Sequence, residues 1–185
     1  FVIATLVLVI TAYVLRNWQI ARTGRNAFEQ GTNAYKMQNW RQSAACFKRY
    51  LFINPSDVNV LLKYAQAQLN IIPVNQTNTS QAIASYRNVL RIDRDNSEAA
   101  EKLTDLYLQL ELPSEAEIVA KRFLKTKQIP NIKLSLAVSY IKQRKINEAY
   151  ELLQLLLREN PGMIQAYDVM GRMAEQYPTF NLSPA

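Results

Sequence analysis

The sequence predicts an all-α fold in which antiparallel helix pairs follow a single transmembrane helix. Three observations support this prediction: an uncharged N-terminal run, small residues that recur at fixed spacing, and an Asn-Pro stop that ends two apolar stretches. The composition agrees, because 49% of the 185 residues are apolar and only 4 are Gly and 7 are Pro. Such a composition is typical of an ordered, helix-rich chain.

The first expected element is a membrane anchor. Residues 1–15 (FVIATLVLVITAYVL) carry no charge, and a spanning helix needs roughly 20 apolar residues. Because the numbering begins at Phe, we expect the anchor to start upstream of it. The expected membrane-interface residues are one aromatic and three cationic side chains: Trp18, Arg16, Arg22 and Arg25. The alternatives are a cleaved signal peptide, which would need an A-x-A-like site after the run, and a buried core helix.

The expected location is therefore a membrane, with one span and with lipid contacts through residues 1–22. The net charge of +7 gathers near this segment, since residues 1–50 hold seven basic groups and one acidic group. Anionic lipid accounts for such a cluster, whereas nucleic-acid binding would need a basic stripe over the folded body. The arginines favour a cytoplasmic domain, but a lone N-terminal anchor commonly exports the domain after it, so the side stays open with a preference for the periplasmic or extracytoplasmic one.

Small residues recur through the rest of the chain. A first set aligns at Gly31, Ala65, Thr104, Ala137 and Gly171, and a second set follows 12 or 17 residues later at Ser43, Ala82, Ala116 and Ala149. Two small residues at this spacing fit two antiparallel helices that approach closely across a short turn. A non-repeat bundle with chance spacing is the alternative, and nine small residues in nine aligned positions argue against it.

Proline marks the ends of the pairs. Pro55 and Pro161 each follow an apolar stretch and cannot continue a helix. The loop-forming residues 70–80 (NIIPVNQTNTS) account for the longer spacing in the second pair. We expect helices near 25–38, 40–53, 57–70, 79–92, 97–110, 114–126, 131–143, 147–159 and 163–176.

A period of about 34 residues with this small, aromatic and proline pattern resembles the tetratricopeptide repeat (TPR) family. The resemblance covers roughly residues 24–177, and residues 31–55 and 136–161 carry it most clearly. It implies about four and a half repeats in a right-handed superhelix, with the first helix of each pair lining a concave face. The expected domains are an anchor and basic segment at 1–22, the TPR domain at 23–177, and an extended tail at 178–185 that leads to a further C-terminal region.

The resemblance also implies a partner-binding groove. Its candidate residues come from the first helices of four pairs: Phe28, Thr32, Tyr35, Leu62, Gln66, Leu69, Glu98, Glu101, Asp105, Leu134, Val138 and Ile141. The Lys/Asn/Arg clamp by which some TPR domains seize a carboxylate is not reproduced, because Phe28, Thr32, Lys63, Glu98 and Lys102 stand at the matching places. The groove then suits an apolar or mixed-charge segment, unless its acidic residues are only a solvated helix face.

The residue inventory argues against catalysis. The chain has no His and a single Cys46, so it lacks the parts of zinc sites, Cys-His pairs and Ser-His-Asp triads. We expect no catalytic residue, no metal, no cofactor, no small-molecule substrate and no nucleic acid. The expected partners are other proteins. The leading hypothesis is a membrane-anchored scaffold or accessory subunit, and the alternatives are a transient peptide-recognition module, such as an assembly or targeting factor, and the front end of a longer enzyme.

The last predicted helix lacks an evident partner. We expect residues 163–176 to pack Tyr167, Met170, Gly171 and Ala174 onto the preceding pair. An unpaired repeat helix leaves an apolar face uncovered. We therefore expect a following segment or a partner subunit to cover an apolar surface near Met173 and Tyr177.

Overall fold

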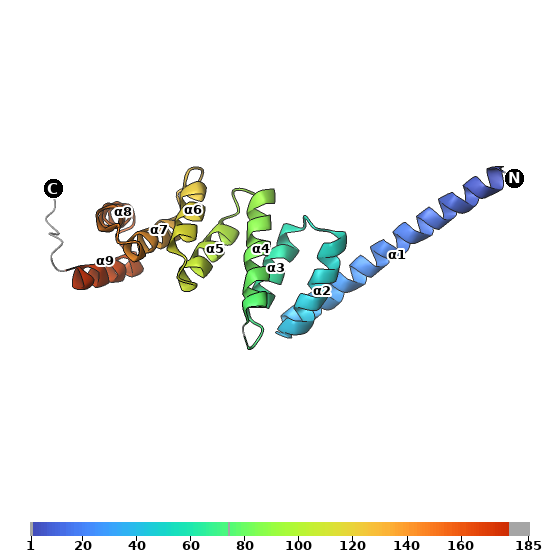
Figure 1. The fold of residues 1–185 in the computed structure, drawn as a ribbon, viewed down its shortest axis with the longest axis horizontal. Helices are drawn as coiled ribbons and strands as arrows, with labels where there is room; N and C mark the ends of the chain where they lie inside the picture. Colours follow the sequence, from blue (N-terminus) through green and yellow to red (C-terminus); the bar gives the residue numbers. More distant parts are fainter. Residues whose placement is uncertain (1, 74, 178–185) are drawn as a thin grey trace. The chain divides into compact units, whose positions relative to one another are not determined.

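A computed structural model shows the chain to be helical. It describes residues 2–73 and 75–177, with side chains from residue 10 onward, and this part of the chain contains helices and no strand. The helices are α1 (Val2–Lys36), α2 (Trp40–Ile53), α3 (Val58–Leu69), α4 (Gln76–Ile92), α5 (Ser97–Gln109), α6 (Pro113–Leu124), α7 (Pro130–Lys142), α8 (Ile146–Glu159) and α9 (Ile164–Gln176) (Figure 1). The expected tail at 178–185 lies outside the described residues.

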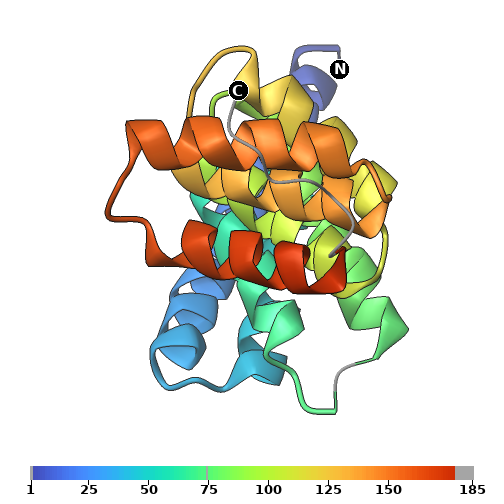
Figure 2. The same ribbon diagram turned by 90° about the vertical axis from the view of Figure 1, so that its left-hand side faces the viewer.

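The helices belong to two compact units, Phe1–Ile92 and Asp93–Ala185. In the first unit α1 packs on α2 and α3 on α4; in the second, α5 packs on α6 and α7 on α8. Helix α9 lies beside α7 and α8 in the second unit (Figure 2). Among the described residues, four pairs and one further helix agree with the predicted count of about four and a half repeats.

The small residues lie where the two helices of a pair meet. Ser43 donates a hydrogen bond of 3.1 Å from its Oγ to the carbonyl oxygen of Gly31, which only a close backbone approach permits. A Cβ added to Gly31 would stand 2.7 Å from Cδ1 of the fully buried Phe47. The aligned residues of the other pairs are all fully buried: Ala65, Ala82, Thr104, Ala116, Ala137 and Ala149. Cys46 is also buried, as its type predicts.

Three pairs share one turn. Gln38, Glu111 and Arg144 each stand seven residues after the small residue of the first helix, and each has a positive φ, between 55° and 61°. The next amide then donates back across the turn, as from Asn39 to the carbonyl of Ala34 and from Lys145 to that of Tyr140. This is a Schellman helix ending, which Gly normally occupies. The second pair has the longer loop instead, and Asn75 caps α4 there through the amide of Asn78, so α4 begins three residues earlier than predicted.

The two Asn-Pro stops act as predicted. Helix α2 ends at Ile53 and α8 at Glu159, with Asn54 and Asn160 as C-caps. Each cap donates its backbone amide to the carbonyl four residues earlier, at Tyr50 and at Leu156. Proline follows directly in both places and cannot extend the helix.

The predicted membrane anchor is wrong. Among the described residues, no helix has a stretch that is long and apolar enough to cross a bilayer. The expected single-pass membrane location and lipid contact through residues 1–22 are withdrawn with it.

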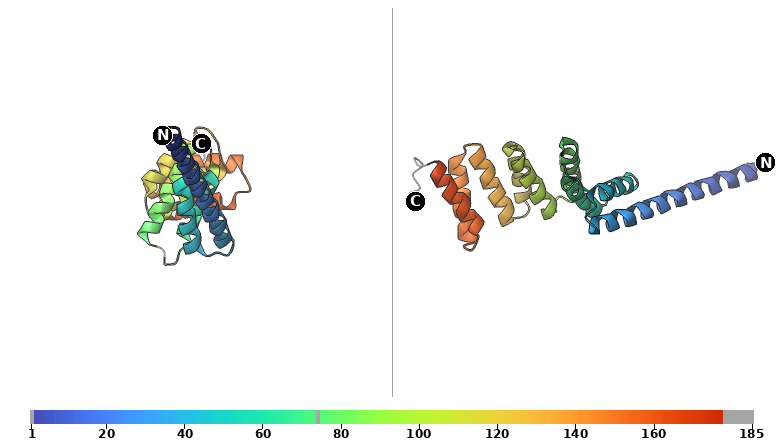
Figure 3. Two further views of the ribbon diagram at one scale, coloured as in Figure 1. Left: turned by 90° about the vertical axis from the view of Figure 1, so that its right-hand side faces the viewer. Right: turned by 90° about the horizontal axis from the view of Figure 1, so that it is seen from below.

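Residues 1–22 are also not a separate helix. Helix α1 is continuous from Val2 to Lys36, and its first half extends beyond α2 (Figure 3). The four expected interface residues are all exposed on this helix. Two of them interact with each other, since the Arg22 guanidinium lies 5.4 Å from the centre of the Trp18 ring, a cation–π contact.

The register of α9 also differs from the prediction. Ala166, Val169 and Met173 are buried and pack onto the cluster formed by α7 and α8. Tyr167 and Gly171, which were expected to pack inward, are exposed. Met173 is therefore part of the core and does not await a covering surface.

Two equivalent glycines give a matched test of this packing. Gly31→Ala should lower the free energy of unfolding by about 1–3 kcal/mol, because the new methyl group would overpack the buried Phe47 ring. Gly171→Ala should raise it by about 0.5–1 kcal/mol, because nothing lies within 4 Å of the new methyl group and Ala favours a helix interior. Urea unfolding of both variants measures the two changes, and changes of the same sign would contradict the packing described.

Candidate functional site

The predicted groove residues of the first unit lie on α1 and α3. The Tyr35 hydroxyl donates a hydrogen bond to the side-chain oxygen of Gln66, so the structure brings these two candidates together. Leu62 and Leu69 are half-buried on the same helix as Gln66. Thr32 is half-buried, and its Oγ1 has no hydrogen-bond partner among the described residues.

Aromatic packing occupies two of the same candidates. The ring of Phe28 lies 5.2 Å from that of Tyr50 on α2. The ring of Tyr35 meets that of Trp40 edge-on at 5.3 Å. Both candidates thus hold α1 against α2, and a partner-binding role for the α1–α3 residues stays a prediction.

The acidic candidates of the second unit connect α5 to α7. Asn131 donates to Glu101 over 3.0 Å, and the Ser135 hydroxyl donates to Asp105 over 2.8 Å. Burial raises the pKa of Asp105, and the hydrogen bond from Ser135 acts in the opposite direction. Glu98 alone of the three is exposed. Glu101 and Asp105 therefore form neither a free acidic patch nor a merely solvated face.

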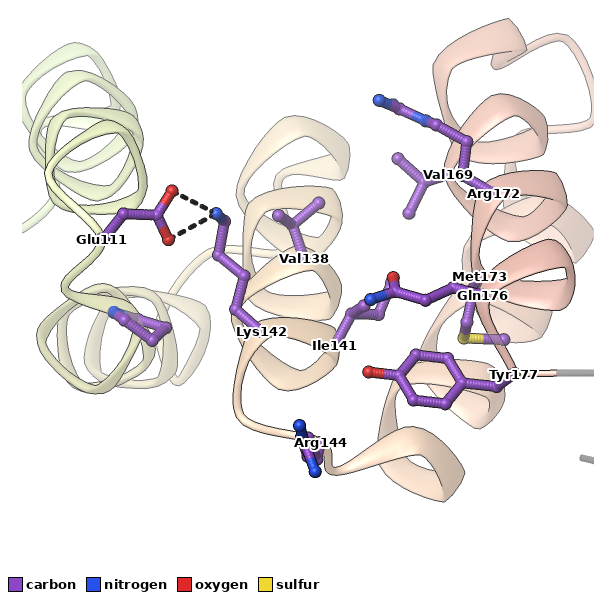
Figure 4. A pocket seen from close by; sticks show the side chains of 11 residues that line it. Glu111, Val138, Ile141, Lys142, Arg144, Val169, Arg172, Met173, Gln176 and Tyr177 are labelled. Atoms are coloured by element: carbon purple, nitrogen blue, oxygen red, sulfur yellow. Dashed lines mark hydrogen bonds and ion pairs between the residues drawn. The ribbon is translucent and has the colours of Figure 1, made fainter.

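The apolar candidates of α7 open onto a cleft. Val138 and Ile141 line a cleft of about 570 Å³ together with Val169 and Met173 of α9 and Tyr177, which follows that helix. Figure 4 shows the side chains of α7 and α9 facing each other across it. The third apolar candidate, Leu134, is half-buried and packs against the core beneath. A second, smaller cleft of about 450 Å³ is lined by another groove candidate, Phe28, together with Tyr50 of α2.

Cationic groups border the cleft. Lys142 lies 2.8 Å from Glu111 (Figure 4), and Arg172 lies 2.6 Å from Asp168, with both side chains mostly exposed. Such exposed pairs contribute little to stability and can exchange partners. Arg144 is exposed and has no ion-pair partner among the described residues. The rim can therefore bind an anionic group.

A half-buried carboxylate fixes the loop that carries Arg144. Glu117 on α6 accepts hydrogen bonds of 2.7 Å from both neighbours of Arg144, Gln143 and Lys145, and one of 2.5 Å from Lys121. Burial acts to raise the pKa of Glu117, but the hydrogen bonds from Lys121, Lys145 and Gln143 prevail and lower it to about 2. These contacts tie the two residues that flank Arg144 to α6.

The sequence alone did not identify most of this site. Val169 and Arg172 were missed because α9 was assigned the wrong inward face, whereas Tyr177 was expected beside a surface that a partner covers. Arg144 and Glu111 were missed because a turn position carries no periodic signal, although both stand seven residues after an aligned small residue. Among the described residues, no group of three or more His, Cys, Asp and Glu side chains could hold a metal ion.

Comparison with known proteins agrees with this architecture. Residues 134–162, which cover most of α7, all of α8 and the turn after it, match the tetratricopeptide repeat family model. The chain has a TPR-like fold. A search of curated protein sequences found no match.

Solved structures share the TPR-like fold at low sequence identity. A MamA structure from Desulfovibrio magneticus RS-1 is 13% identical with a TM-score of 0.70, over 84% of this chain and 86% of that one. YrrB, described as a TPR protein with an unusual peptide-binding site, is 12% identical with a TM-score of 0.64, over 82% and 76%. TTC0263, a thermophilic TPR protein from Thermus thermophilus, is 16% identical with a TM-score of 0.56, over 90% and 93%.

The lowered pKa of Glu117 makes stability depend on pH. A carboxyl that titrates near 4.5 when unfolded and near 2 when folded stabilises the fold above pH 4.5 and loses that effect as the pH falls toward 2. The free energy of unfolding of Glu117→Gln should therefore be lower than that of the unaltered chain at pH 7, and the difference should shrink between pH 4.5 and 2. Glu151→Gln, at an exposed position of α8, is the control. A difference that stays constant with pH would contradict the proposed role of Glu117.

Proposed function

We propose that this chain is a non-catalytic interaction scaffold whose α7–α9 cleft binds an extended segment of a partner protein. The observation that carries the proposal is the cleft itself, with an apolar floor at Val138, Ile141 and Val169 and cationic groups around its rim. TPR repeats generally mediate contacts between proteins, and the match to the family model begins at Leu134, on the helix that forms one wall of the cleft.

The chemistry of the walls defines the ligand. The floor would bury one large apolar side chain, and burial of such a side chain stabilises a complex by about 1.5–3 kcal/mol before its costs are counted. Arg144 would then bind an acidic side chain or a terminal carboxylate close to that anchor. A segment that combines a Leu or Phe with Asp or Glu fits both features, whereas a basic segment would meet Arg144 and Arg172.

The size of the cleft favours low-affinity, reversible binding of the partner segment. One apolar side chain in a cleft of about 570 Å³ makes a much smaller contact than a stable subunit interface does. Of the two non-catalytic hypotheses, transient peptide recognition therefore accounts for this cleft better than permanent assembly does. YrrB, a TPR protein with an unusual peptide-binding site, shows that this fold can carry such a site.

A fluorescent peptide series tests the proposal. Short peptides with one Leu or Phe flanked by Asp or Glu should bind the chain, and the same peptides with Lys in place of the acids should bind more than about tenfold more weakly, or roughly 1.4 kcal/mol. Arg144→Glu should remove this preference. Arg158→Glu makes the same charge change at an exposed position of α8 outside the cleft, so it is the matched control. Equal affinities for the two series, or equal effects of the two variants, would contradict the proposal.

A further inference from the structure

A polar cleft of the first unit lies between α2 and the first turns of α4. Its volume is about 390 Å³, which is within the range of about 300–1,000 Å³ that is typical of small-molecule sites. Helix α2 lines one side of it with two cations and two small residues: Arg41, Lys48, Ala44 and Ala45. The facing side comes from the end of α3, the loop after it and the start of α4. This α2–α4 cleft shares no lining residue with the α7–α9 cleft.

The α2–α4 cleft has a strongly cationic environment. Among the described residues that line it, Arg41 and Lys48 are charged and none is acidic. Neither cation forms an ion pair with another described residue. Residues 1–92 hold ten basic and two acidic groups, a net charge of +8, whereas residues 93–185 hold twelve basic and thirteen acidic groups. The positive charge of the chain is therefore concentrated in the unit that contains this cleft, where it attracts anions.

The amide side chains of the facing wall offer donors more than acceptors. Asn78 is only 9% exposed, and its Nδ2 has no hydrogen-bond partner among the described residues. The side-chain oxygen of Asn75 already accepts from the backbone amide of Asn78 over 2.8 Å. That of Gln81 accepts from the Tyr64 hydroxyl and from the Gln68 amide, each over 2.6 Å. A buried donor without an acceptor is costly, and an anion in the cleft would supply the acceptor that Asn78 lacks.

Two further features favour an anion at this position. The Arg41 guanidinium donates to the carbonyl oxygen of Ile72 over 3.1 Å, which holds it beside the cleft. It has five N–H donors, so the others remain available to a ligand. The N-terminal end of α4, a helix of 17 residues, also carries a partial positive charge that stabilises a nearby anion.

We propose that the α2–α4 cleft binds the phosphate group of a small organic molecule. A phosphate monoester carries a charge of about −1.5 to −2 at neutral pH and three acceptor oxygens, which matches two cations and the unpaired Asn78 donor. A carboxylate supplies one charge and two oxygens. The organic part of the ligand would lie against apolar lining residues, Ala44, Ile71 and Pro73. This inference goes beyond the proposed function, which concerns the other unit, and does not depend on it.

A titration of the 185-residue chain with phenyl phosphate, followed by ¹H–¹⁵N NMR at constant ionic strength, tests the proposal. The amide shifts should saturate and should be largest around Arg41 and Asn78. Phenyl phosphate should bind more tightly than inorganic phosphate, because its ring can contact the apolar wall. Benzoate, which has the same ring and a single charge, should bind at least about tenfold more weakly.

Three variants assign the binding to this cleft. Lys48→Gln should weaken phenyl phosphate binding by about tenfold, since it removes a charge-assisted contact. Lys36→Gln removes the same charge from an exposed position of the same unit outside the cleft, so it is the matched control and should change the affinity by less than about twofold. Asn78→Asp should abolish binding through charge repulsion while the chain still folds, because an acidic residue is favourable in the first turn of a helix.

Three results would overturn the proposal. The first is the absence of saturable shifts around Arg41 and Asn78. The second is benzoate that binds as tightly as phenyl phosphate, which would show that the cleft does not select a phosphate. The third is an equal loss of affinity in Lys48→Gln and Lys36→Gln, which would show a diffuse attraction to the charge of the whole unit. Saturable binding that Lys48→Gln weakens and Lys36→Gln does not supports a phosphate site.

Discussion

A close contact between two small residues sets the geometry of each helix pair. In the first pair, Gly31 and Ser43 allow the helices to approach until a side-chain hydroxyl binds a backbone carbonyl. In the other three pairs the aligned small residues are fully buried. Packed interiors of this density tolerate little added volume, so the identity of these residues determines how far apart the helices can lie. The shared left-handed turn seven residues later then fixes where the second helix begins in three of the four pairs.

The surfaces of the chain follow from this constraint. The first helices of neighbouring pairs are then held together by hydrogen bonds between polar side chains. Tyr35 binds Gln66 in this way, and Ser135 binds Asp105. Beyond α7 the regular arrangement changes, because α9 packs on the preceding pair without a second helix of its own among the described residues. Its inner side forms a wall of the cleft, and its outer side stays uncovered.

Sequence patterns predicted the parts of the fold that depend on local chemistry. The helices after the first were placed within about three residues, because small residues and prolines recur at fixed spacing and act through the backbone. The inward face of α9 was not predictable, since Ile164, Ala166, Tyr167, Val169 and Met170 place apolar groups all around the helix. The proposed anchor was wrong because no helix of the described residues has an apolar stretch long enough to cross a bilayer.

The candidate site was less predictable than the fold. Val138 and Ile141 were chosen from their helix position and do line the cleft, but whether they bind a partner stays a prediction. Glu101 and Asp105 were expected to be free, whereas they are bound to Asn131 and Ser135, on a helix about 30 residues away in the chain. Such contacts depend on the tertiary arrangement, which single-sequence periodicity does not describe.

Native-state hydrogen exchange tests most directly whether a first helix depends on its second helix. The comparison is between the amides around Ala137 in α7, which has a second helix, and those around Gly171 in α9, which has none among the described residues. After correction for intrinsic exchange rates, the account predicts clearly lower protection in α9, because fewer buried contacts oppose its local opening. Protection of α9 equal to that of α7 would contradict the account, since it would show that the small-residue seam is not what holds a first helix in place.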